Sequence, residues 1–176
     1  MDLLANLLVG LGTGIISSLM FLFFLTKVRP KLELSKEIAY ETIDIEGNPT
    51  PCYVFKLINK TWRSKIYDVE AQLFLLRYDV TEGGQNIFFR ALPLLKERVW
   101  SLNCINKNDQ YAEFAYQFLC LGNLDEIWNE NNNIEITVRA RHAFSGFTKT
   151  VKQRYYRKGS SIKVGAFKFG NNMDIC

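Results

Sequence analysis

The sequence predicts a mainly β protein, a β-sandwich carried on one N-terminal transmembrane helix. Two observations lead to this fold class. No charged residue occurs in residues 3–26, whereas charges are frequent from Lys27 onward. After Lys31, short segments of alternating apolar and polar residues are separated by turn-forming residues, which is typical of strands. We therefore expect a transmembrane anchor over residues 1–28 and a β-sandwich domain over residues 29–176.

The apolar segment of residues 3–26 is long enough to cross a bilayer. As a helix it reaches roughly 36 Å, against a hydrocarbon core of about 30 Å. A cleaved signal peptide is not expected, because residues 21–25 lack the small side chains of a cleavage site. Basic residues keep their end of a span in the cytoplasm, and Lys27, Arg29 and Lys31 follow the segment. We predict a single-pass protein of the cell membrane, with its N-terminus outside and its C-terminal domain cytoplasmic.

In this topology the same three basic residues lie at the depth of the lipid headgroups. We therefore predict that Lys27, Arg29 and Lys31 contact the lipid bilayer. Two roles remain open for them. They either determine topology alone or also bind a specific anionic lipid.

One face of the expected helix carries only small residues at every fourth position, namely Gly10, Gly14 and Ser18. Small residues with this spacing let two helix backbones approach closely. This face is therefore a candidate for association into a homo-oligomer. The alternative is that glycine is simply common in membrane helices.

Strands account for most of the remaining chain. They are expected at residues 31–35, 53–58, 66–77, 87–90, 134–141, 147–156 and 161–169. The imperfect alternation of residues 66–77 indicates a β-bulge, and Glu82-Gly83 indicates a hairpin turn. One helix is expected within residues 121–128, with Asn123 as its N-cap.

Several motifs occur in a recognisable order. A basic stretch and an extended strand occupy residues 27–34, and the Glu82-Gly83 hairpin follows. The last part of the chain contains residues 134–138, Gly146, Thr150, residues 153–155 and residues 162–169. In this order the chain resembles the cytoplasmic domain of inward-rectifier potassium channels over residues 27–170, with gaps.

The resemblance implies an immunoglobulin-like β-sandwich that assembles as a tetramer below the membrane. It also implies that basic residues near the bilayer recognise anionic lipid, a role that transfers here to Lys27, Arg29 and Lys31. A channel of that family has a second membrane helix and a Thr-x-Gly-Tyr-Gly filter, which this sequence lacks. Potassium selectivity therefore does not carry over.

Composition and spacing argue against several functional classes. The 22 basic and 18 acidic residues are dispersed, so no nucleic-acid surface is expected. Cysteine pairs with CxxC spacing are missing and His142 is the single histidine, so we expect no metal, no cofactor and free thiols in a reducing compartment. His142 is interpreted as an ordinary surface residue, and no enzymatic activity is expected.

A basic cluster near the C-terminus is the candidate for ligand binding. It contains Lys152, Arg154, Arg157 and Lys158, next to Tyr155 and Tyr156. Arginine forks and aromatic rings together suit an anion or a nucleotide. The alternative is a solvated strand face.

These observations support two functional hypotheses. In the first, the cytoplasmic domain oligomerises and senses a ligand or protein partner, and the helices form a bundle that gates or perturbs the membrane, a layout typical of bacterial defence effectors. In the second, the chain is a scaffold or accessory subunit that tethers a partner protein and forms no pore. A third class, a membrane-bound enzyme, requires a catalytic partner beside His142.

Overall fold

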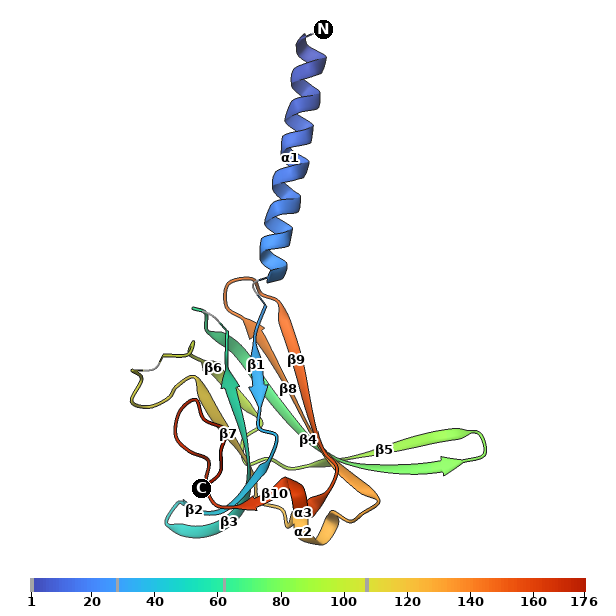
Figure 1. The fold of residues 1–176 in the computed structure, drawn as a ribbon, viewed down its shortest axis with the longest axis vertical. Helices are drawn as coiled ribbons and strands as arrows, with labels where there is room; N and C mark the ends of the chain where they lie inside the picture. Colours follow the sequence, from blue (N-terminus) through green and yellow to red (C-terminus); the bar gives the residue numbers. More distant parts are fainter. Residues whose placement is uncertain (1, 28, 62, 107) are drawn as a thin grey trace.

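The fold consists of one N-terminal helix and a mainly β region with two sheets. The computed structural model describes residues 2–27, 29–61, 63–106 and 108–176. Helix α1 (Asp2–Lys27) projects from one end of the β region, as Figure 1 shows. The C-terminus lies on the β region, far from the free end of the helix. The predicted division into an apolar helix and a strand-rich remainder is confirmed.

Helix α1 is apolar along its length, and none of its apolar window is buried in the part of the chain that the structure describes. Its apolar stretch Leu4–Leu25 has 22 residues, which is long enough to span a membrane. The large apolar side chains from Leu4 to Phe24 are 55–69% exposed. Helices this apolar are stable only when another apolar phase covers them.

The first sheet, sheet A, is built around a long central strand, β3 (Asn48–Asn59). One edge of β3 pairs with β1 (Leu32–Leu34) and β2 (Ile38–Ile45), and the other edge pairs with β7 (Ala115–Cys120). The short strand β10 (Ile162–Val164) adds to β2 in parallel.

The second sheet, sheet B, is built around β4 (Ile66–Thr81), which pairs on one edge with β5 (Gly84–Leu92) and β6 (Arg98–Leu102). Its other edge pairs with β8 (Asn132–His142), and β8 pairs with β9 (Thr148–Tyr155). The predicted β-bulge is confirmed, since the register of β4 and β8 shifts between Tyr67 and Glu70. Asp68 lies inside this bulge with φ +50°.

The main core lies between the two sheets. Sheet A contributes alternate residues of β3, and sheet B contributes alternate residues of β4 and β8; these are Tyr53, Phe55, Leu57, Ala71, Leu73, Leu75, Ile134, Ile136, Val138 and Ala140. The alternation follows from the two-residue period of a strand, which places successive side chains on opposite faces. The inner faces of both sheets are therefore already occupied.

The expected strands are found, although their extents differ: β3, β4 and β5 are longer than expected. The strand expected at residues 161–169 is shorter, because helix α3 (Lys158–Ser161) precedes it and β10 ends at Val164. The expected helix is the short α2 (Leu124–Ile127), and the Asn123 side chain accepts the Asp125 amide N–H as predicted for an N-cap. Strands β2, β6 and β7 were not expected.

The outer face of sheet A is covered by the C-terminal segment, residues 166–176. Phe167 and Ile175 pack there against Ala39, Cys52 and Val54. The buried Lys56 side chain fastens this segment, because its Nζ donates to the carbonyl oxygens of Lys168 at 2.6 Å and Asn172 at 2.8 Å. Burial lowers the pKa of Lys56, so both carbonyls are needed to compensate its lost hydration.

We predict that Lys56→Met loosens the C-terminal segment. Methionine keeps an apolar stem but removes the donors, so two carbonyl oxygens lose their partner at a cost of about 1–3 kcal/mol. Hydrogen exchange of the Ala166 and Cys176 amides, which bond to each other's carbonyls, measures the change.

The control is Lys168→Met, which removes only an exposed 3.7 Å ion pair to Asp174. Such a pair contributes about 0–1 kcal/mol. Equal protection of residues 166–176 in wild type and Lys56→Met contradicts this assignment.

Candidate functional site

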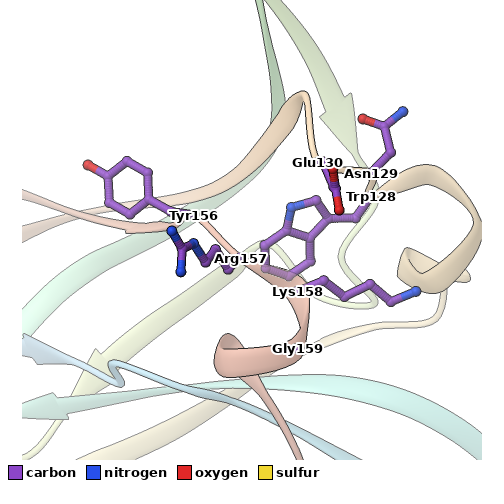
Figure 2. A pocket seen from close by; sticks show the side chains of 7 residues that line it. All are labelled: Trp128, Asn129, Glu130, Tyr156, Arg157, Lys158 and Gly159. Carbon is purple, nitrogen blue, oxygen red and sulfur yellow. The ribbon is translucent and has the colours of Figure 1, made fainter.

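A surface pocket lies at the end of the β region that is far from α1. It has a volume of about 720 Å³. One wall is the connection from α2 to β8 and the other runs from the end of β9 into α3, as Figure 2 shows. The lining residues are Trp128, Asn129, Glu130, Tyr156, Arg157, Lys158 and Gly159.

Two polar contacts hold the walls of this pocket in place. Lys158 Nζ lies 2.8 Å from the carboxylate of Asp125 and also donates to the backbone carbonyl oxygen of Asp125 at 2.9 Å. Lys158 thereby joins α3 to α2. The hydrogen bond from Lys158 lowers the pKa of Asp125. The buried Trp128 ring is fixed because its Nε1–H donates to the Asn132 carbonyl oxygen at 2.9 Å. The pocket is therefore a built feature of the fold.

Lys158 is paired with Asp125, so Arg157 is the cation of this pocket that is available to bind a ligand. Figure 2 shows its guanidinium between the Tyr156 and Trp128 rings, whereas Lys158 extends away from them. Tyr156 is exposed, and no carboxylate of the described residues pairs with Arg157. An unpaired guanidinium beside an exposed ring suits a planar or phosphate-bearing anion.

The other two residues of the predicted cluster, Lys152 and Arg154, lie elsewhere. They are on the outer face of sheet B, where both pair with Glu135, whose side chain is only 4% exposed. Arg154 binds one carboxylate oxygen through Nε at 3.0 Å and Nη2 at 2.6 Å, and this raises the pKa of Arg154. Lys152 is more distant, at 3.6 Å. The structure thus brings Arg157 and Lys158 together and separates them from Lys152 and Arg154.

The predicted lipid-contact residues lie where the chain leaves α1. The Arg29 guanidinium is 5.9 Å from the centre of the Phe147 ring, on the turn between β8 and β9. The Lys31 amide N–H donates to Thr61 Oγ1 at 2.9 Å, while its own side chain is exposed. The side chain of Lys27 lies outside the described residues.

The predicted association face of α1 is a shallow groove. Gly10, Gly14 and Ser18 line it together with Leu11, Ile15, Leu19 and Leu22. The Ser18 hydroxyl donates to the Gly14 carbonyl oxygen at 2.8 Å, so its polar group is satisfied within the helix. Apart from the adjacent residues and the backbone of the same helix turns, no described atom lies within 4 Å of where a Cβ on Gly10 or Gly14 would be. The groove is open to a partner.

The interpretation of His142 as a surface residue is wrong, because its side chain is 1% exposed. It ends β8 under the turn to β9, and its Nδ1 accepts the Ser145 amide N–H at 3.0 Å. The Nδ1 lone pair is thus engaged and unsuited to activate the Ser145 hydroxyl, which lies at the same distance. Among the described residues, Nε2 has no hydrogen-bond partner and no group of three His, Cys, Asp or Glu side chains could hold a metal.

The comparisons add no family assignment. No protein-family model matches the chain, and no curated protein matches it.

Sequence reasoning missed Trp128 and Glu130 as pocket residues and Glu135 as the buried partner of Arg154. Trp128 is the last residue of the segment expected to contain the helix and directly follows α2, so an aromatic ring at a helix end was an available signal. Glu135 gave no such signal, because in an alternating strand it occupies an ordinary outward position.

We predict that Arg154→Met destabilises the domain by about 2–4 kcal/mol, because the buried Glu135 carboxylate loses its main partner. Lys152→Met should cost less than about 1 kcal/mol, since that pair is longer and more exposed. Denaturant unfolding of the full chain in mild detergent compares the two variants. Equal effects would show that the pairing does not decide the stability of this face.

We also predict that the stability of the domain falls in acid because of His142. Burial lowers the folded-state pKa of His142 below 6.5, so below that pH the unfolded chain binds a proton that the folded chain does not. The free energy of unfolding should therefore decrease as the pH falls from about 6.5 towards the folded-state pKa. In His142→Gln this contribution should vanish, which unfolding between about pH 8 and pH 5 measures.

Proposed function

We propose that the chain is a single-pass membrane protein, without enzymatic activity, whose cytoplasmic domain forms a homo-oligomer and senses a ligand or partner. In this proposal ligand binding changes the packing of the α1 bundle and so gates or perturbs the membrane, as in a bacterial defence effector. The domain is proposed to be an immunoglobulin-like β-sandwich of the inward-rectifier type. The N-terminus lies outside the cell.

The observation that carries this proposal is the exposure of α1. Its 22-residue apolar stretch is not buried in the described structure, and the helix stands clear of the β region (Figure 1). Burying so many apolar side chains in a bilayer is strongly favourable, at roughly 25 cal/mol per Å². Membrane insertion therefore gives α1 the apolar surroundings that the chain itself does not supply.

Basic residues at the exit of α1 support the proposed orientation. Lys27, Arg29 and Lys31 follow the helix within a few residues, and such residues favour the cytoplasmic side. The stacking of Arg29 on Phe147 places the β8–β9 turn next to the same exit. Lys31 keeps an exposed side chain for the headgroups of anionic lipid.

One buried hydrogen bond links the strand end beside the proposed sensing pocket to the segment that follows α1. Tyr156 and Arg157 of the pocket follow Tyr155, the last residue of β9. The buried Tyr155 hydroxyl donates to the Ser35 carbonyl oxygen at 2.8 Å, and Ser35 follows β1, which comes shortly after α1. An anionic ligand on Arg157 would thus pull on a strand end that is bonded to the segment leading from the membrane.

The scaffold role without a pore is the second candidate. It is favoured by the absence of any charged side chain in residues 3–26, since such a helix offers no charged ion pathway. The two candidates agree on membrane anchoring and differ in whether the α1 helices form a defined bundle.

Native mass spectrometry of the full chain in mild detergent tests the proposal. A discrete homo-oligomer that retains an anionic species supports sensing by an assembled module. A monomer, or a single copy bound to another protein, favours the scaffold role. A chain that washes off membranes at high pH contradicts anchoring altogether.

We predict that Gly14→Leu weakens oligomerisation through α1 by about tenfold or more, or about 1.4 kcal/mol, because the side chain fills the close-approach face. The variant should stay in the membrane but lose dye release from liposomes. Gly12→Leu, on the opposite side of the helix, is the matched control and should behave as wild type. Unchanged assembly in Gly14→Leu would mean that this face is not the contact.

A further inference from the structure

The hairpin formed by β4 and β5 extends beyond the rest of sheet B as an arm. The arm comprises residues 78–87, because the last β4 residue with a β8 partner is Arg77, opposite Asn132. From Tyr78 to Thr81 the strand pairs only with β5. Figure 1 shows the arm reaching sideways, across the direction of α1.

The two faces of the arm differ in chemistry. Directly opposed residues point to the same side of a hairpin, so the pairs Leu76–Phe89, Tyr78–Ile87 and Val80–Gln85 share one face. On this face Val80 is 83% exposed, Ile87 43% and Phe89 59%. The other face carries the Arg77–Asp79 ion pair, with the Arg77 guanidinium 5.5 Å from the centre of the Phe88 ring.

An isolated two-stranded hairpin is only marginally stable in water. A hairpin with an exposed apolar face is less stable still. The arm therefore needs a cover for the face that carries Val80, Ile87 and Phe89. We propose that this face binds the same face of a second copy of the chain, with the two arms antiparallel and related by a two-fold axis near the Tyr78–Ile87 pair.

The direction of α1 supports a second copy as the occupant. This step rests on the proposed membrane anchoring, which places every copy at the same depth and restricts symmetry axes to the membrane normal. An arm that runs across α1 stays at one depth and so meets its counterpart. Rotation by 180° about the normal reverses the direction of the arm, which gives the antiparallel arrangement.

Charge complementarity supports the same register. The tip of the arm carries Glu82, which has no ion pair among the described residues. A two-fold axis at Tyr78 places the tip of one arm over Phe74 of the other copy, because both residues lie four positions from the axis. Phe74 is opposite Glu135, and Glu135 is opposite Arg154. Glu82 then approaches the cluster of Lys152, Arg154 and Glu135 of the partner subunit, in which two cations and one carboxylate leave one net positive charge, and the contact occurs twice.

Cross-linking of the full chain tests this contact. Cys104 and Cys176 are changed to serine, which leaves the buried Cys52 and Cys120, and Ile87→Cys is added on the apolar face. A short bismaleimide should give a covalent dimer, in detergent and in nanodiscs. Asn86→Cys, on the opposite face of the same strand, is the matched control and should cross-link severalfold less.

Two further variants separate this contact from the others. Glu82→Lys should reduce the Ile87→Cys cross-link severalfold, because it places like charges together. Gly14→Leu should leave the cross-link unchanged, since the arm does not involve the α1 groove. Equal yields at positions 86 and 87, or no dimer at either, overturn the arm contact. Loss of the protein from the membrane fraction, by contrast, counts against the anchoring and is scored separately.

Discussion

Everything in this structure depends on the need to keep α1 out of water. Its apolar side chains are more than half exposed from Leu4 to Phe24, so only a bilayer or other apolar helices can cover them. The segment that follows α1 is held on the β region by two contacts. Arg29 packs on Phe147, and the Lys31 amide bonds to Thr61. In the proposed membrane anchoring, the end that carries the pocket faces away from the bilayer, where soluble ligands and partners are accessible.

The outer face of each sheet is organised around one buried ion. Lys56 on sheet A holds the C-terminal segment through two carbonyl oxygens, and Glu135 on sheet B is held by Arg154 and Lys152. Buried ions of this kind add little net stability, because their desolvation offsets the attraction. They do penalise alternatives, since a displaced segment or a shifted strand would leave a buried charge without a partner. We infer that they fix the position of the C-terminal segment and the register of β8 and β9.

The sequence was informative where a pattern is local and failed where tertiary contacts decide. The apolar helix, the strand at residues 134–141 and the Asn123 cap follow from period and capping chemistry alone. The β2–β3 hairpin was missed, because the prolines at 49 and 51 weaken the strand pattern. In the structure Glu46 and Gly47 form its two-residue turn, and both have positive φ angles. The predicted basic cluster lies at two separate places in the structure, because β9 ends at Tyr155. Strand alternation therefore could not predict the positions of Arg157 and Lys158, which come after the strand. The burial of His142 depends on the β8–β9 turn folding over it.

Strand β9 connects the features on which the proposed functions rest. Its outward residues Lys152 and Arg154 border the root of the arm, and its inward Tyr155 bonds to Ser35 beside β1. The residues that follow, Tyr156 and Arg157, form the pocket. In the proposed sensing role, a displacement at the end of β9 would act through the Tyr155–Ser35 hydrogen bond next to β1 and through the Arg154–Glu135 pair next to β4. A ligand that binds Arg157 more tightly in one assembly state than in another would shift the equilibrium between those states by that difference in affinity. The proposed sensing role therefore requires no hinge between domains, only a differential contact at one strand end.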